Sequence, residues 1–459
     1  MKKIFFSITI LFSAIQFLTA QNFNLQLRSE VSYNYDCASL WGYAVNGREY
    51  ALVGTDIGMS IVDVTDPDNP SLLFDIDHVG AHGLWQEIKT YGHYAYEVNE
   101  TGKGVLVVDL QNLPTSYTQS NFIYDPPQGT TQTTGHAIWI DEKGRMFIFG
   151  GNYSQGYACF DLAADPLNPP FIGKFSTRYI HDGFVRGDTL WAGEISDGLC
   201  EIINVADPAN PIVMASWSTP NNFTHNVWPT SNNKYCFTTD EVDNSYLTSY
   251  DVTDFSNVTE LDRAQSNPGS NVIIHNVHLY NDQFATTAYY KDGVVIFDVS
   301  HPDNMIQVGS YDTDPLESGG GFAGCWGVYP YLPSGNIIAS DYIDAGAPGG
   351  KLSVLTPTWV AACWLEGLVT DSATGAALNN VKAEIVSTIQ TDLTDLSGNY
   401  KTGYGIPGNY NIVFSKLGYA PKQINNVALT SGVVTILNVK LAALIAYPVT
   451  GQVTDSVTN

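Results

Sequence analysis

The chain has 459 residues, which is more than one compact core usually organises and predicts at least two domains. It carries 46 acidic but only 20 basic residues, and this acidic balance excludes nucleic acid and anionic membranes as partners. Its 27 tyrosines and 41 glycines, with abundant Asn, Ser and Thr, favour an all-β, turn-rich protein.

The N-terminus has the pattern of a secretory signal peptide. Lys2 and Lys3 precede an apolar run that ends at Leu18, and Ala20 completes a small-residue cleavage site. We therefore predict that residues 1–20 are removed and that the protein is exported to the cell surface or medium. The run is shorter than the roughly 20 residues that a membrane-spanning helix needs, and no other segment is a candidate for such a helix.

The cysteines show no Cys-x-x-Cys spacing and are expected to be mostly buried free thiols.

Five stretches share one pattern, a histidine followed by an apolar or aromatic strand-like run. Successive histidines are 54, 45, 44 and 50 residues apart. A repeat of this length without a helical pattern predicts a β-propeller, in which each repeat forms one four-stranded blade around a common axis. The histidines of these stretches are His82, His136, His181, His225 and His275.

Two more stretches have the same layout without histidine. They begin at Leu40 and Cys325, carry Trp-Gly near the start, and reach an aspartate 16 positions later. The seven starting points predict seven blades. The last blade lacks an outer strand of its own, and residues 23–31 can fill that place, which leaves no open sheet edge. The predicted propeller therefore covers residues 21–357.

A second repeated signature lies late in the repeats. An apolar strand runs into an Asp-Pro or Asn-Pro turn, because proline ends the ladder and the Asp or Asn side chain caps the turn. The strands Ile61–Val64 and Val295–Val299 resemble LVIVD repeats. Residues 80–96 and 328–338 also resemble the bacterial choice-of-anchor B proteins, a resemblance that extends over about residues 30–357. It implies export and surface display, and it does not imply an established reaction.

Residues 364–443 read as short alternating strands between Gly, Asn and Asp turns, which predicts a small β-sandwich. They resemble the carboxypeptidase regulatory-like (transthyretin-like) domains, which have a carbohydrate-binding-like fold and imply a spacer or binding module. Gly451–Ser456 then repeats Gly367–Ser372 at an offset of 84 residues, so residues 447–459 are expected to begin a second, truncated copy. The predicted fold class is all-β, a seven-bladed propeller followed by a small β-sandwich.

An acidic residue follows three of the five histidines at a similar distance, 13 to 16 residues later. The histidine opens the first strand of a blade and the acid closes the second, so both lie at one end of an antiparallel hairpin. We therefore expect five imidazoles and up to six carboxylates at one channel mouth. The carboxylates are Asp56, Glu97, Glu194, Asp240, Glu241 and Asp341.

Histidine with carboxylate is a ligand set for zinc, iron, manganese or copper, and such a metal can activate water or an oxidant. The candidate ligands of a divalent transition metal are His82, His136, His181, His225, His275, Glu97, Glu194, Asp240 and Asp341. Asp56, Glu241 and Trp326 are candidates for ligand binding. Repetition also suits a structural role, in which each histidine bonds within its own blade, and binding without metal stays open.

The leading hypothesis is a monomeric, surface-associated propeller that binds an extracellular ligand, protein or glycan, with the sandwich as a spacer. The alternative is a metal-dependent hydrolase or oxidoreductase at the histidine ring. No phosphate-binding loop, nucleophile elbow or dinucleotide fingerprint is present in the sequence. The other four histidines, His78, His93, His278 and His301, are expected in loops or at the surface.

Overall fold

The computed structural model describes residues 22–78, 80, 82–315, 319–342 and 349–444. The expected signal peptide and the expected second module copy lie outside these residues. The described residues form strands and turns, and they include no helix long and apolar enough to cross a membrane.

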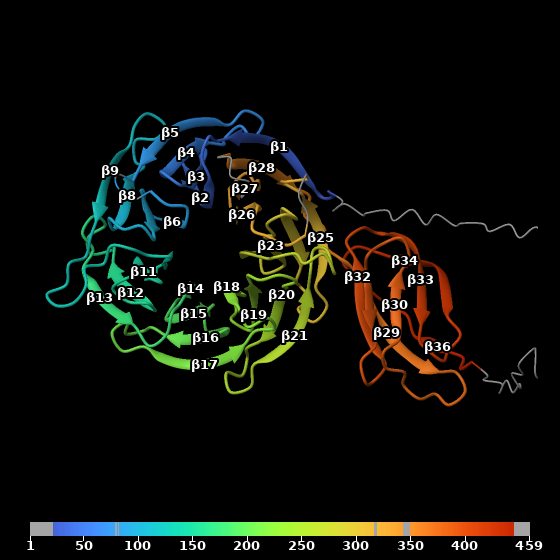
Figure 1. The fold of residues 1–459 in the computed structure, drawn as a ribbon. Helices are drawn as coiled ribbons and strands as arrows, with labels where there is room; N and C mark the ends of the chain where they lie inside the picture. Colours follow the sequence, from blue (N-terminus) through green and yellow to red (C-terminus); the bar gives the residue numbers. More distant parts are fainter. Residues whose placement is uncertain (1–21, 79, 81, 316–318, 343–348, 445–459) are drawn as a thin grey trace, which may run out of the picture.

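The main body of the described chain is a ring of seven four-stranded antiparallel sheets (Figure 1). In blades one to six, four consecutive strands pair in chain order. Blades one to three contain β2 (Cys37–Val45), β3 (Arg48–Thr55), β4 (Gly58–Asp63), β5 (Ser71–Asp77), β6 (Gln86–Tyr91), β7 (Tyr94–Asn99), β8 (Val105–Asp109), β9 (Thr118–Phe122), β10 (Ala137–Ile140), β11 (Arg145–Phe149), β12 (Tyr157–Asp161) and β13 (Phe171–Phe175). Blades four to six contain β14 (Asp182–Arg186), β15 (Thr189–Glu194), β16 (Leu199–Asn204), β17 (Ile212–Ser218), β18 (Thr224–Pro229), β19 (Tyr235–Asp240), β20 (Leu247–Asp251), β21 (Thr259–Ala264), β22 (Val277–Tyr280), β23 (Phe284–Ala288), β24 (Val294–Asp298) and β25 (Ile306–Tyr311).

Blade seven is built from both ends of the propeller. Its strands are β26 (Gly324–Tyr329), β27 (Ile337–Tyr342), β28 (Lys351–Pro357) and the N-terminal β1 (Leu25–Ser32). Leu25 pairs with Pro357 and Ser32 pairs with Lys351, with one bulge between them. β1 therefore gives β28 an antiparallel partner, and the first strand of each blade contacts the first strand of the next around the ring. The structure is thus the predicted seven-bladed all-β propeller.

Local sequence explains the shape of each blade. The third strands are apolar and nearly fully buried, as in β4 and β24, whereas the outer β5 is mostly exposed. The turn that follows the third strand is capped by side-chain oxygens: Asp66 Oδ1 accepts the amide of Asp68 and Asp207 Oδ1 accepts the amide of Ala209. These local bonds stop the ladder and return the chain for the outer strand.

The propeller core lies between adjacent blades and is rich in large aromatic side chains. Tyr50, Phe147, Trp191 and Phe237 are completely buried. All six cysteines are buried free thiols, so hydrophobic packing and hydrogen bonding hold the ring together without disulfides.

A small β-sandwich follows the propeller (Figure 1). One sheet contains β32 (Asn399–Tyr404), β29 (Cys363–Asp371), β35 (Val433–Ile436) and β36 (Val439–Leu441). The other contains β31 (Thr391–Leu393), β30 (Lys382–Ile385), β33 (Gly408–Ser415) and β34 (Lys422–Leu429). Val369, Ile385, Tyr400 and Phe414 meet in its own hydrophobic core, which is the second predicted domain.

Trp364, at the start of β29, joins the two domains. It is buried in the propeller core cluster, and its indole Nε1–H donates to the carbonyl of Asn304 over 3.0 Å. The Asn304 side chain in turn donates to Glu366 and to the carbonyl of Thr402. The sandwich therefore sits on the blade-six turn through a buried side chain and a satisfied hydrogen-bond network.

Candidate functional site

Four of the predicted histidines lie together at one mouth of the central channel. Each stands at or just before the first strand of its blade, so blades three to six deliver them in sequence. Neighbouring ring centroids are 3.9 Å apart for His136 and His181, 4.6 Å for His181 and His225, and 4.2 Å for His225 and His275. We call these four residues the histidine cluster.

The carboxylate of Glu241 faces two members of the histidine cluster. Glu241 follows β19, and its Oε2 lies 3.7 Å from Nε2 of His225 while its Oε1 lies 3.8 Å from Nε2 of His275. One potential ligand atom each from His181, His225 and Glu241 all lie within 4.8 Å of one another. This spacing would accommodate one ion among three donors, two nitrogens and one oxygen.

Two of the imidazoles have an assignable tautomer. His275 Nδ1 lies 2.6 Å from the carbonyl oxygen of Trp326, and His136 Nδ1 lies 2.6 Å from Oε1 of Glu100. A carbonyl or carboxylate oxygen only accepts, so Nδ1 carries the proton in both rings. In a neutral ring with this tautomer Nε2 keeps its lone pair, which is the arrangement that metal-binding histidines usually have.

Burial keeps His181, His225 and His275 uncharged. Removal from water, together with the neighbouring imidazoles, lowers the pKa of His225 and of His275 to about 3. The same causes lower the pKa of His181 well below its ordinary value. A metal binds only the neutral ring, so these residues are ready to act as ligands at neutral pH.

Tyr290 fixes the carboxylate. Its ring is completely buried 5.1 Å from that of His275, and its hydroxyl donates to Oε1 of Glu241. Burial, and then the negative charge of Glu241, raise the pKa of Tyr290 well above its ordinary value. The phenol therefore stays protonated and remains a hydrogen-bond donor to Glu241.

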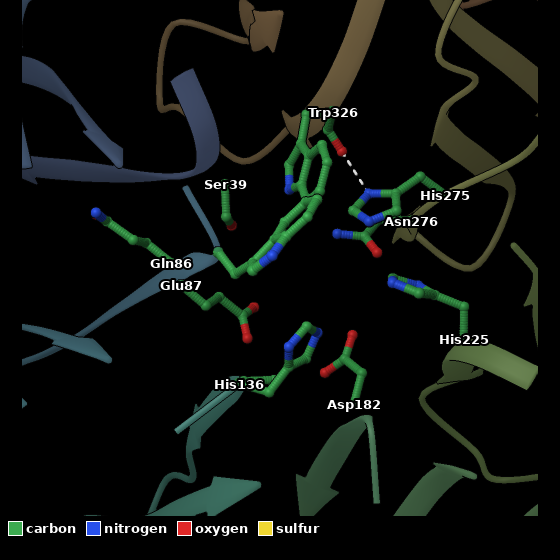
Figure 2. A pocket seen from close by; sticks show the side chains of 11 residues that line it. Ser39, Gln86, Glu87, His136, Asp182, His225, His275, Asn276 and Trp326 are labelled. Carbon is green, nitrogen blue, oxygen red and sulfur yellow. Dashed lines mark hydrogen bonds between the residues drawn. The ribbon is translucent and has the colours of Figure 1, made fainter. Parts of the chain in front are cut away.

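A small pocket adjoins the histidine cluster (Figure 2). Its free space of about 30 Å³ is enough for an ion with a water molecule. Asp182 and Glu87 line it, and burial together with the charge of Glu87 raises the pKa of Asp182 to about 7. Asn226 donates to Asp182 over 2.6 Å, and the amide of Ile138 donates to Glu87 over 2.9 Å. The pocket wall is thus a hydrogen-bonded polar layer.

Aromatic side chains close the channel behind this layer. Trp139, Trp228 and His278 stand three residues further along their strands than His136, His225 and His275, about 10 Å deeper. Trp139 and Trp228 are 5.5 Å apart, Trp228 and His278 are 4.6 Å apart, and Trp41 is 6.2 Å from both Trp139 and His278. These rings span the axis, so the pocket opens on one face of the propeller.

The fifth predicted histidine does not join the cluster. His82 is 53% exposed, and its Nε2 is 2.7 Å from Oδ1 of Asp77. The prediction that it opens a strand was wrong, because β6 begins only at Gln86. Gln86 and Trp85 line the pocket on that side.

The acids that close the second strands also lie away from the cluster, one strand further from the axis. Glu97 is buried against His78, with 3.3 Å between its Oε1 and Nδ1 of the ring. Glu194 lies beside Glu201 and Arg178. Asp240 accepts hydrogen bonds from the Thr219 hydroxyl and the Asn221 amide. Asp341 is 3.4 Å from Nζ of Lys351. Asp56 is half-buried in the β3–β4 turn and accepts the amide of Gly83 through its carbonyl. Of the six expected carboxylates, the described structure brings Glu241 to the histidines.

Trp326, a candidate for ligand binding, lines the pocket, and its carbonyl accepts a hydrogen bond from His275. Sequence reasoning missed Glu87, Glu100, Asp182 and Tyr290. Asp182 directly follows a predicted histidine, and this adjacency was the available signal. The expectation that His278 lies in a loop or at the surface was wrong, because it is buried within β22. His78 does lie in a loop, between β5 and β6, but it is buried there.

Family models match three parts of the chain. The LVIVD repeat matches residues 42–78 and 276–313, which are blades one and six. The chain thus contains two LVIVD repeats within its propeller. The carboxypeptidase regulatory-like domain matches residues 365–442, which form the β-sandwich that follows the propeller. No curated protein matches the chain.

Proposed function

We propose that this chain is an exported LVIVD propeller that binds a divalent transition-metal ion at one channel mouth, with the β-sandwich as its spacer. One observation carries the proposal: donor atoms of His181, His225 and Glu241 lie within 4.8 Å of one another. These residues come from blades four and five, so folding of the ring brings them together.

The donor set favours a first-row transition metal. Imidazole nitrogens with one carboxylate suit zinc, copper, iron or manganese, whereas calcium and magnesium prefer oxygen ligands alone. His136 and His275 flank the three donors and can complete the coordination. The hydrogen bonds from His136 to Glu100 and from His275 to the Trp326 carbonyl are the supporting contacts expected around a metal site.

A purely structural role accounts less well for the cluster. Buried polar atoms in a structural network normally have partners, because an unsatisfied one costs about 1–3 kcal/mol. Nδ1 of His225 is buried and has no hydrogen-bond partner in the described part of the chain. Four imidazoles packed ring to ring also share few mutual hydrogen bonds, and an ion held by their ring nitrogens would stabilise this packing.

Metal analysis of the purified protein tests the proposal. After incubation with zinc, copper or manganese and removal of the excess, we expect about one tightly bound ion per chain. A His181→Ala/His225→Ala double variant should lose it, and the isosteric Glu241→Gln variant should bind it much more weakly. His82→Ala is the matched control, because its exposed pair with Asp77 contributes little to stability.

Thermal unfolding shows whether the variants are folded. A ligand at 100 times its Kd stabilises the folded state by about 2.7 kcal/mol, so the metal should raise the melting temperature of the wild type and of His82→Ala but not of the double variant. A wild-type protein that binds none of these ions, or a folded double variant that still binds one, would overturn the proposal.

Catalysis is the second candidate, and the free space beside the donors favours it. Three protein ligands leave a position for water on zinc, and the pocket has room for that water. Hydrolysis of p-nitrophenyl acetate and p-nitrophenyl phosphate by the zinc-loaded protein, but not by the double variant, would support a hydrolase. Bound metal with no hydrolysis would leave binding as the function.

A further inference from the structure

The same channel mouth carries an aromatic surface beside the histidine cluster. Trp85 stacks on Trp326 with 4.9 Å between ring centroids and 30° between ring planes, and Trp326 lies 4.6 Å from His275. Trp326 is 7% exposed, whereas Trp85 is 41% exposed. Since Trp326 covers one face of Trp85, its other face is presented to solvent at the edge of the pocket.

A hydrogen-bonding group lies in the same pocket. Asn276, which follows His275, turns its amide toward the space that Trp326 and His225 border (Figure 2). Its Oδ1 is buried and has no hydrogen-bond partner among the described residues. An unsatisfied buried amide oxygen is costly, and a ligand hydroxyl would satisfy it.

The charges at this mouth restrict the ligand further. Glu100 is 42% exposed beside His136, and Glu241 lies among the histidines. These carboxylates disfavour an anionic ligand and accept hydrogen bonds from hydroxyl groups. A planar aromatic ligand would stack on Trp85 but would leave the carboxylates and Asn276 without partners.

We propose that Trp85 and Asn276 form a binding subsite for a neutral sugar ring at the channel mouth. The weakly positive C–H face of the sugar stacks on the negative face of the indole, and its hydroxyls pair with Asn276 and Glu100. The subsite goes beyond metal binding and does not depend on it, because neither residue belongs to the proposed ligand set.

Calorimetric titration of chelator-treated protein with neutral hexasaccharides tests the subsite, with cellohexaose, maltohexaose, mannohexaose and chitohexaose as probes. We expect at least one to bind, and hexagalacturonate, which is anionic, not to bind. Trp85→Ala should weaken binding about tenfold or more, because it removes an aromatic stack. Asn276→Ala should also weaken it.

Phe255→Ala is the matched control, because Phe255 is a similarly exposed aromatic residue on the β20–β21 turn. Unchanged sugar affinity in Trp85→Ala would overturn the proposal, as would the absence of binding to all four neutral sugars. Sugar binding is measured on metal-free protein throughout, so the sugar proposal can fail while the metal proposal holds, and the reverse. Melting temperatures of both variants establish that they are folded.

Discussion

The imidazole of His136 donates its Nδ1–H to Oε1 of Glu100 over 2.6 Å, across the boundary between blades two and three. The bond fixes the ring of His136, which stacks on His181 at 3.9 Å between centroids. Blade two, which supplies no histidine to the cluster, thus orients the first member of it.

Loss of this contact should weaken metal binding without removing a ligand. We expect Glu100→Ala to lower metal affinity about 10–100-fold, the usual effect of removing a partner of a metal-binding histidine. Chelator competition measures it. Glu260→Gln, an exposed acid on the outer strand of blade five, is the control and should keep wild-type affinity. Equal affinities of Glu100→Ala and the wild type would show that His136 does not contact the ion.

Glu194, which lies beside Glu201, should make the free energy of unfolding depend on pH. Burial, and then the charge of Glu201, raise the pKa of Glu194 from 4.5 to about 9. The folded state then holds a proton that the unfolded state releases, so stability should fall as pH rises from about 4.5 to about 9. Glu194→Gln removes this titration.

Urea unfolding of wild type and Glu194→Gln at several pH values checks this prediction. The two curves should diverge with rising pH, and the variant should be the more stable protein near pH 9. Parallel curves over the whole range would contradict the raised pKa. Glu260→Gln again serves as a control, because its carboxylate is exposed.

Because Trp364 joins the propeller to the sandwich, removal of its side chain should uncouple the unfolding of the two domains. Trp364 is buried in the propeller core cluster although it belongs to the first strand of the sandwich. Trp364→Ala should cost about 3–5 kcal/mol and should split one calorimetric transition into two. Trp217→Ala, which removes a half-buried indole within blade four, should lower the melting temperature without splitting the transition.

Closure of the ring predicts that the N-terminal strand is required for stability. A variant that lacks residues 22–32 leaves β28 as an open edge, so it should melt at a lower temperature and aggregate more readily. A synthetic peptide of residues 22–33 should restore part of the lost stability by adding back as a strand. An unchanged melting temperature would show that the β1–β28 pairing contributes little.

The sequence was sufficient to predict the fold class because the blade signal is repeated. Each repeat has a buried third strand, and in blades one, three and four this strand runs into a turn with Asp-Pro and Asn-Pro. The repeats with a clear pattern therefore fix the interpretation of those in which it is weaker. The histidines of blades three to six were placed together for the same reason. His82 was misplaced because β6 starts four residues after it, whereas the first strand starts at most two residues after the histidine in blades three to six. The spacing of 54 residues that follows His82 was also the largest in the series.

The carboxylates were harder to predict because their position depends on distance from the axis. A hairpin brings the ends of its two strands to one side, but the second strand lies about 4.8 Å further out than the first. Glu97 and Asp341 therefore pair with His78 and Lys351 and not with the histidine cluster. Glu241 reaches the histidines because it lies one residue past the end of β19, beyond the ladder. Glu100 and Tyr290 come from turns, whose geometry the repeat pattern does not specify.

The arrangement of blade seven has a mechanical consequence. Leu25, where the chain enters β1, pairs with Pro357, where the chain leaves β28 toward the sandwich. A pulling force between the N-terminus and the sandwich would therefore act at one end of this pair and peel its hydrogen bonds apart one after another. Peeling requires less force than shearing all bonds at once, so tension along the chain should open the ring at this seam before it unravels any other blade.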